Sequence, residues 1–340
     1  MRAGRTILLA FALAAAGAGA ARAQTKTGTA FGDFLLIEPS ARATGMGNAG
    51  VTLLDDQQGV YYNPAAIAEV QQYGVAFSHS AWLADINYNY AGVGVPMGKI
   101  GNAYFSLTAL SSGDIEVRTV AQPLGTGEFF HVTDIAAGVG YGLRVTDRFS
   151  AGIEASFVQE TIWHTSASAV VLNMGTVYRM SDEGLHLGAS ISNFGTDANF
   201  SGRDLEVTFD QDPNVNGDNG TLPAGQLTDA FPLPVLFRVG VSLPRKIGPN
   251  GQLLMAVDAF HPADNTESVS LGTEYAYRNA FAVRAGYQNL FQKDSEVGLT
   301  LGAGLKGKLG GHGNGYAIDY AWADQGRLND THRITVALHF

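Results

Sequence analysis

Apolar and polar residues alternate with a period of two along most of the chain after residue 72. In the stretch 295–306, Leu299, Leu301 and Leu305 occupy one set of positions, and the other set is polar or glycine. Successive side chains of a β-strand point to opposite faces, so this pattern predicts strands with one apolar face. The same alternation occurs in residues 134–145 and 149–157.

Fourteen segments of about ten residues fit this pattern, and an even number is typical of bacterial outer-membrane barrels. The predicted strands are 73–81, 87–97, 100–110, 134–145, 148–160, 168–180, 184–194, 232–244, 251–260, 267–277, 279–288, 295–307, 314–322 and 331–340. The predicted tight connections are 146–147, 181–183 and 278, and the predicted long ones are 111–133, 161–167, 195–231 and 323–330. Short turns alternating with long loops favour a barrel over a soluble sandwich, which alternation alone would fit equally well.

The aromatic residues add to this picture. Ile334, Val336, Leu338 and the terminal Phe340 share one face, which resembles the closing strand of outer-membrane barrels. Aromatic residues near other strand ends suit the girdles found at membrane interfaces, although ordinary β-propensity would also place them in strands. This second group contains Tyr88, Tyr90, Tyr275, Tyr277, Tyr287, Tyr316, Tyr320 and Trp322.

The composition agrees with a barrel in a membrane. Hydrophobic residues make up 46% of the chain and charged residues only 15%, compared with about 25% in typical soluble domains. Beyond the N-terminus no apolar run reaches the roughly 18 residues that a spanning helix needs. With 43 glycines in addition, the sequence predicts an all-β, 14-stranded antiparallel transmembrane β-barrel.

The N-terminus predicts export. Arg2 and Arg5 precede an apolar stretch at 6–21, which ends in Ala21-Arg22-Ala23. A charged start, a short apolar segment and an Ala-x-Ala site are typical of a secretory signal peptide. We therefore expect residues 1–23 to be removed and the mature chain to begin at Gln24.

The charge balance and the motifs exclude several functions. Without the three signal-peptide arginines, 18 basic residues face 31 acidic ones, so no nucleic-acid partner is expected. The chain has no cysteine, and its histidines form no H-E-x-x-H pattern. No G-x-S-x-G elbow occurs either, so the sequence assembles no catalytic set. We predict a protein without enzymatic activity and without a cofactor.

Two motifs have simple alternatives to a ligand site. Residues 45–50 match G-x-G-x-x-G, but Pro39 precedes them and Asp55 follows too soon for a dinucleotide fold, so we interpret the glycines as close-packing positions. Residues 210–218 resemble part of a Ca²⁺ loop, but when the loop is counted from Asp212 its twelfth position is Pro223 rather than glutamate. A solvated acidic loop is the favoured interpretation, and the open alternative is a weak ion site at Asp212, Asn214, Asn216 and Asp218.

Charged residues of both signs occupy the positions that alternation assigns to the inside of the barrel. Such charges are expected to pair across the lumen or with the N-terminal segment rather than to form a filter of one sign. The predicted lumen-facing charges are Asp134, Arg144, Glu154, Arg238, Asp258, Glu274, Arg284, Glu296, Lys306 and Asp319.

Residues 32–68 contain an ordered set of motifs, which comprises Ala41-Arg42-Ala43, Gly45-Met46-Gly47, Asp55-Asp56 and Tyr61-Tyr62-Asn63-Pro64-Ala65. This set resembles the PorV/PorQ family, within the wider FadL-like group of outer-membrane barrels. The sequence departs from the family pattern at Asn48 and at Ala66-Ile67. The resemblance implies three parts: a signal peptide at 1–23, an N-terminal hatch inside the lumen at 24–72 and a barrel at 73–340.

The residues of this predicted hatch suggest how it is held. Arg42 is long enough to reach an inward carboxylate, and Asp55 or Asp56 an inward arginine. Asn63 is suited to bond backbone in a turn, and Pro64 to begin a short helix.

The resemblance also implies a function. We expect an outer-membrane barrel that binds a protein partner or cargo in type IX secretion or a related surface-display pathway, with loops 111–133 and 195–231 as external contacts. The alternative is FadL-like transport of a hydrophobic small molecule, and a purely structural barrel is a third possibility. Membrane lipid is an expected partner in each case.

Overall fold

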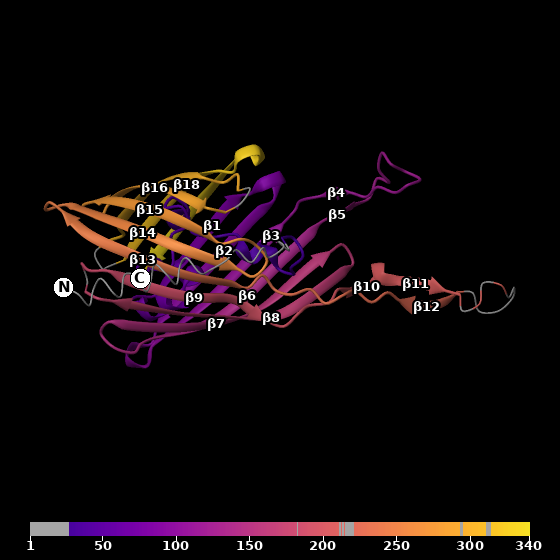
Figure 1. Cartoon of the computed structure of the whole chain (residues 1–340), viewed down its shortest axis with the longest axis horizontal. Coiled ribbons are helices and arrows are strands. Elements are labelled where there is room, and N and C mark those ends of the chain that lie inside the picture. The colour runs from indigo at the N-terminus through magenta and orange to yellow at the C-terminus, as the bar shows by residue number, and fades with distance from the viewer. Residues whose placement is uncertain are drawn as a thin grey trace, which may run out of the picture.

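The computed structural model describes residues 27–181, 183–210, 212, 214, 221–292, 295–310 and 314–340. Within these residues, fourteen antiparallel strands close into a barrel around the N-terminal segment (Figure 1). No helix in the described ranges is long and apolar enough to cross a membrane. The predicted signal peptide at 1–23 lies outside the described residues.

The barrel strands follow one another in chain order, and each pairs with the next. They are β1 (Gly74–Ala81), β2 (Asn87–Pro96), β3 (Asn102–Ser111), β6 (Val132–Arg144), β7 (Phe149–Ile162), β8 (Thr165–Arg179), β9 (His186–Gly195), β13 (Leu236–Ile247), β14 (Gly251–Pro262), β15 (Ser268–Tyr277), β16 (Phe281–Leu290), β17 (Leu299–Lys308), β18 (Gly315–Asp324) and β19 (Asp330–His339). The barrel closes where β19 pairs with β1, from Gly74 opposite His339 to Ala81 opposite His332. The predicted all-β, 14-stranded barrel is therefore confirmed.

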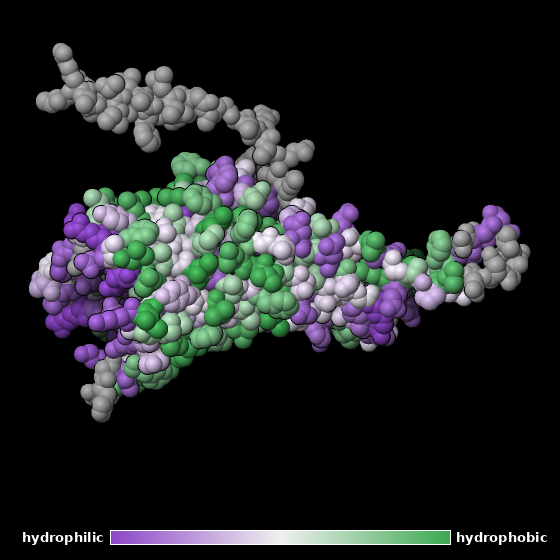
Figure 2. Space-filling view, turned by 90° about the horizontal axis from the view of Figure 1, so that it is seen from below, coloured by the Kyte–Doolittle hydropathy of each residue, from purple (hydrophilic) through white to green (hydrophobic). Residues whose placement is uncertain are grey.

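The two faces of the wall differ as the alternation predicts. On β6, Ile135 and Val139 are exposed on the outside, whereas Asp134 and Ala136 are buried inside. Hydrophobic residues gather over the strands, and hydrophilic residues gather at the end where the tight turns lie (Figure 2). An apolar outer belt with a polar interior is the arrangement of a barrel that faces lipid.

The two ends of the barrel differ in their connections. The end with tight turns, including η4 (Gly98–Ile100), also carries the C-terminus and the start of β1, and we call it the periplasmic end. The opposite, outer end carries η3 (Leu83–Asp85), η6 (Gly326–Leu328) and two long excursions. The first outer arm is residues 112–131, with β4 (Ile115–Glu116) and β5 (Phe129–Phe130); the second outer arm is residues 196–235, with β10 (Ser201–Gly202), η5 (Arg203–Leu205), β11 (Glu206–Phe209) and β12 (Leu222–Gly225). Both arms extend beyond the barrel at the same end (Figure 1).

The hatch, residues 27–72 of the described chain, runs through the lumen from the outer end to the periplasmic end. The Phe31 N–H donates to the Pro232 carbonyl at 2.8 Å at the outer end, and the Phe340 N–H donates to the Tyr73 carbonyl at 2.8 Å where the hatch meets β1. Its short helices are η1 (Asp33–Leu36), α2 (Ala41–Thr44), α3 (Gly59–Tyr62) and η2 (Pro64–Glu69). Residues 39–53 are buried without a break, so this part of the hatch fills the lumen.

Three predicted details are wrong. The expected long loop at 161–167 is a two-residue link between β7 and β8, because the two strands continue beyond their predicted ends. The predicted strand at 295–307 begins only at Leu299. Tyr88 and Tyr90 do not lie at the lipid interface of the barrel. They are buried inside it, where they pack with Phe31 and Phe34 of the hatch.

Candidate functional site

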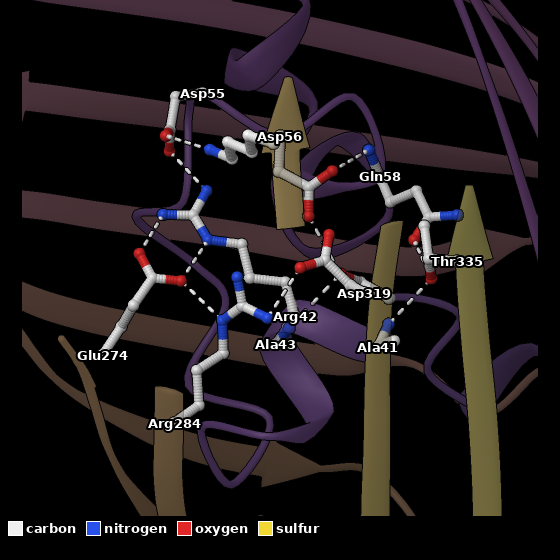
Figure 3. A network of polar contacts seen from close by, with 12 residues as sticks. Ala41, Arg42, Ala43, Asp55, Asp56, Gln58, Glu274, Arg284, Asp319 and Thr335 are labelled. Carbon is white, nitrogen blue, oxygen red and sulfur yellow. Dashed lines mark hydrogen bonds and ion pairs between the residues drawn. The ribbon is translucent and has the colours of Figure 1, made fainter. Parts of the chain in front are cut away.

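Arg42 joins the hatch to the barrel wall. From α2 its Nε and Nη2 both donate to the Glu274 carboxylate of β15, each at 2.8 Å, and its Nη1 donates to Asp55 Oδ1 at 2.7 Å. Figure 3 shows the guanidinium lying between these two carboxylates. A bidentate guanidinium–carboxylate pair fixes orientation as well as charge, so α2 is held in one position against β15.

The ion network continues along the wall from Glu274. Arg284 of β16 donates from Nε to Glu274 and from Nη1 to Asp319 Oδ1 of β18, the latter at 2.7 Å (Figure 3). The side chains of Arg42, Glu274, Arg284 and Asp319 are each at most 8% exposed. Two arginines and two carboxylates balance in charge, and a buried network of this kind is strongly destabilised when one member is removed.

The two adjacent aspartates of the hatch have different roles. Asp55 belongs to the ion network, and its second oxygen lies 3.8 Å from Lys306 Nζ of β17. Asp56 forms no ion pair with an arginine among the described residues; it accepts hydrogen bonds from Ser40 Oγ at 2.9 Å and from the Gln58 N–H at 3.0 Å. Asp56 therefore closes the hatch loop onto the residue that precedes α2.

Thr335 is a hatch contact that the sequence motifs do not indicate. Its Oγ1 accepts from the Ala41 N–H at 3.0 Å and donates to Gln58 Oε1 at 3.1 Å. The alternation of β19 puts Thr335 on the same inward face as Arg333, so this periodicity is the signal that could have identified it.

Glycines let the hatch backbone touch the wall backbone. A Cβ built on Gly302 of β17 would lie 3.0 Å from the Gly45 Cα, and a Cβ built on Gly45 would lie 2.9 Å from the Gly302 Cα. Gly47 has a φ of 66° and donates its N–H to Thr300 Oγ1 at 2.9 Å. Gly272 and Gly286 of the wall meet Met46 and Gly47 as closely. The structure therefore agrees with close packing as the role of the glycine motif.

The Asn63-Pro64-Ala65 motif fixes the periplasmic half of the hatch. Asn63 Oδ1 accepts the Ala65 N–H at 3.0 Å and so caps η2, in which Pro64 occupies the first turn. Its Nδ2 donates to the carbonyls of Val51 at 3.0 Å and Thr176 at 3.1 Å. One side chain therefore ties together two parts of the hatch and β8.

The two tyrosines of α3 contact the opposite side of the wall. Tyr61 donates its hydroxyl to the Leu35 carbonyl at 2.7 Å, and the Arg238 guanidinium of β13 lies 5.4 Å from the centre of the Tyr61 ring. Tyr62 is fully buried, and its carbonyl accepts from Ser190 Oγ at 2.8 Å. These contacts connect α3 to β9 and β13.

Five of the predicted inward charges contact the hatch. Glu274 binds Arg42 and Lys306 lies near Asp55, as described above; the remaining three contacts are Asp258 with the Val51 N–H at 2.8 Å, Arg144 with Glu69, and Arg238 with Tyr61. The wall charges and the hatch motifs thus form one interface.

Four other predicted charges belong to the wall itself. Arg284 and Asp319 pair with each other, and Glu154 accepts from Ser106 Oγ at 2.6 Å and from Asn173 Nδ2 at 3.1 Å. Asp134 is buried on the inner face of β6, and its Oδ1 has no hydrogen-bond partner among the described residues.

The prediction for Glu296 is wrong. Glu296 lies before β17 in the connection that follows β16, it is exposed, and it pairs with Arg327 of η6. Apolar and polar residues already alternate before the first residue of β17, so the pattern placed Glu296 in the strand.

The acidic stretch 210–218 is only partly described. Asp212 and Asn214 are exposed, and Asp212 Oδ1 accepts the Asn214 N–H at 3.1 Å, whereas Asn216 and Asp218 lie outside the described residues. Across the described residues, no group of three His, Asp or Glu side chains is arranged to hold a metal ion.

The outer arms are braced by the β7–β8 hairpin. Trp163 at its tip packs on Phe130 of the first arm, with ring centres 5.9 Å apart. The neighbouring His164 Nδ1 lies 2.9 Å from Asp204 Oδ1 of the second arm. Both arms also present apolar side chains to solvent: Val120, Leu124 and Phe129 on the first, and Val207, Phe209, Leu222 and Leu227 on the second. Supported arms with exposed apolar side chains are suited to contact another macromolecule.

Comparisons with known proteins give the family and the fold. The sequence model of the family described as Type IX secretion system protein PorV matches residues 20–196. A sequence comparison with curated proteins gave no match.

Solved structures of hydrocarbon transporters share the fold. The Pseudomonas putida toluene transporter TodX is 11% identical with a TM-score of 0.54, and the match covers 84% of this chain and 94% of that one. The monoaromatic hydrocarbon channel CymD is 12% identical with a TM-score of 0.53, covering 89% and 97%. The Ralstonia pickettii toluene transporter TbuX is 10% identical with a TM-score of 0.51, covering 89% and 97%. At these identities the likeness shows the FadL-like barrel fold alone.

Proposed function

Because this chain belongs to the PorV family of type IX secretion system proteins, we propose that it binds a protein partner or cargo of that pathway, or of a related surface-display pathway. The observation that carries the proposal is the family match over residues 20–196, which spans the hatch and the barrel strands up to β9. The family and the fold place the protein in the bacterial outer membrane.

The structure supports binding from the outside rather than chemistry inside. The hatch fills the middle of the lumen, and both arms carry exposed apolar side chains at the outer end. Interface energy is usually concentrated in a few apolar and aromatic side chains of this kind. We therefore assign partner contact to the two outer arms and no catalytic step to the barrel.

Polar substitution of the second outer arm is expected to abolish partner capture. The triple variant Phe209→Ser, Leu222→Ser and Leu227→Ser removes three exposed apolar side chains from the arm and leaves the barrel strands unchanged. Binding energy at an interface is concentrated in a few residues that contribute about 2 kcal/mol or more, so the loss of one such anchor should lower capture at least tenfold. Quantitative pull-down of proteins that carry a type IX C-terminal signal measures this.

A matched control comes from the opposite end of the barrel. Met97→Ser with Ile100→Ser removes exposed apolar side chains from the periplasmic turn at η4 and should leave capture unchanged. Equal capture by the arm variant and wild type would contradict the assignment of the second arm.

A cavity between hatch and wall favours a second candidate function, the transport of a hydrophobic small molecule. It measures about 240 Å³ at the periplasmic end. Leu53, Leu254 and Phe281 contribute apolar surface to its lining, and charged residues of the ion network at Arg42 line it as well. An engineered apolar cavity of about 150 Å³ binds benzene, so a compact apolar ligand fits this volume. Uptake through the barrel would also require the ion network at Arg42 to open. Growth on a hydrophobic nutrient that depends on this protein would support the second candidate.

A further inference from the structure

A cavity at the outer end of the barrel lies between the start of the hatch and the β14–β15 hairpin. It measures about 280 Å³, and three carboxylates line it: Asp33 and Glu38 from the hatch and Asp264 from the hairpin connection. The Ser270 hydroxyl of β15 also lines this cavity; the residue is 1% exposed, and its Oγ has no hydrogen-bond partner among the described residues. We call this the outer acidic cavity.

The three carboxylates lack paired cations. In the described part of the chain, no lysine, arginine or histidine forms an ion pair with any of them, unlike the carboxylates of the ion network at Arg42. Burial raises the pKa of Asp33, and the nearby Asp264 raises it further. Burial also raises the pKa of Glu38, although the charges of Arg238 and Arg333 lower it in part. Asp33 therefore lies partly buried beside a second carboxylate, and a positively charged ligand between them would be stabilised.

The side chains that line the cavity favour an organic cation over a metal ion. The three carboxylates do not form a group arranged for a metal ion, since no such group occurs within the described residues. Apolar surface from Leu36 and Phe260 lies in the same cavity. An ammonium or guanidinium on an aliphatic stem satisfies both features, because its several N–H donors can reach separated acceptors while the stem covers apolar surface.

We propose that the outer acidic cavity receives a lysine or arginine side chain of the partner polypeptide. Ser270 Oγ provides a neutral acceptor for one N–H group, and the carboxylates balance the charge. The partner's identity as a polypeptide rests on the proposed function.

The surroundings provide room for more than one residue of a partner. A second cavity of about 260 Å³ shares Leu36, Glu38 and Asn48 with the outer acidic cavity and reaches Trp82 at the end of β1. Neighbouring residues of an extended segment can therefore lie along the outer mouth while one basic side chain enters the cavity.

Calorimetric titration of the mature, detergent-solubilised protein with short peptides tests the cavity directly. Acetyl-Ala-Arg-Ala-amide is expected to bind saturably, and the same peptide with neutral citrulline in place of arginine at least tenfold more weakly. Asp33→Asn and Asp264→Asn should each lower the affinity for the arginine peptide at least fivefold. The control Asp147→Asn removes one exposed carboxylate from the periplasmic turn between β6 and β7 and should leave binding unchanged. O-phosphoethanolamine, the headgroup of an amine-bearing lipid, should not compete.

Several results would overturn the proposal. They are equal binding of the arginine and citrulline peptides, undiminished binding by both aspartate variants, competition by O-phosphoethanolamine, or displacement of the peptide by Ca²⁺ alone. Heat-modifiable mobility in electrophoresis verifies that each variant is a folded barrel.

A pull-down with the double variant Asp33→Asn, Asp264→Asn separates this inference from the proposed function. If wild type and the double variant capture the same polypeptide equally, partner binding stands and the cavity has no part in it. If wild type captures no polypeptide while the arginine peptide still binds the cavity, the proposed function fails and the cationic site stands. Capture by wild type with at least a fivefold loss in the double variant is the expected result.

Discussion

Replacement of Arg42 with alanine is expected to release the hatch from the wall and turn a closed barrel into a conducting one. The change removes the bidentate contact to Glu274 and the contact to Asp55, and it leaves two wall carboxylates with Arg284 alone. Breaking a buried ion pair on one side costs about 3–5 kcal/mol. The strand ladder does not involve the Arg42 side chain, so the barrel itself should still fold.

Conductance across a planar lipid bilayer measures the release. Wild type should remain closed, Arg42→Ala should show frequent large openings, and Arg42→Lys should be intermediate because lysine keeps the charge but not the planar fork. Arg148→Ala, at an exposed periplasmic turn, is the matched control and should behave as wild type. A closed Arg42→Ala barrel would show that the ion network does not hold the hatch.

Gly286→Ala is expected to force the hatch away from the wall although it adds only one methyl group. A Cβ at this position of β16 would lie 2.8 Å from the Gly47 Cα and closer still to the Gly47 nitrogen. Overpacking a filled interior usually costs about 1–3 kcal/mol, and here the obstacle is backbone, which cannot change its rotamer. In a strand without this contact, alanine in place of glycine would be neutral or stabilising.

Trypsin cleavage after Arg42 reports the displacement, because Arg42 is 4% exposed in the closed structure. Cleavage should be at least tenfold faster in Gly286→Ala than in wild type. Gly315→Ala on β18 is the control, since its Cβ would lie at an ordinary 3.4 Å from the Gly307 carbonyl oxygen. Equal protection of Arg42 in both variants would contradict direct backbone contact between hatch and wall.

The wall could be predicted from the sequence because its signal is local. Each strand carries its own alternation, and most predicted ends lie within a few residues of the observed ones; the prediction 251–260, for example, compares with β14 at Gly251–Pro262. Errors arose where alternation begins before the first paired residue, as at Glu296, or where strands continue past their predicted ends, as at the β7–β8 link.

The hatch contacts could be predicted only in kind. The length of Arg42 indicated a carboxylate partner, but Glu274 is 232 positions further along the chain, and its choice depends on where the fold places β15. Asp55 and Asp56 are adjacent and chemically identical, so the sequence does not show which of them binds an arginine. In the structure Asp55 accepts from Arg42, whereas Asp56 accepts from Ser40.

Tyr88 and Tyr90 show a further limit of sequence patterns. Both alternate with asparagines, so the pattern at this end of β2 assigned the tyrosines to the apolar outer face. In the structure the tyrosines are buried, and the exposed face is the one that carries Asn87 and Val93. The inward direction of the tyrosines follows from the apolar hatch residues Phe31 and Phe34, which they pack against. In the outer half of the barrel, the direction of these tyrosines therefore depends on contacts with the hatch and not on the pattern of β2 alone.

The most direct test of partner binding by a closed barrel is a pull-down of the detergent-extracted wild-type protein that identifies both bound polypeptides and bound lipids. Partner binding predicts stoichiometric capture of a secreted polypeptide or a secretion-system component, with no hydrophobic ligand retained in the lumen. Recovery of a stoichiometric hydrophobic small molecule without any polypeptide would contradict it and would establish transport instead.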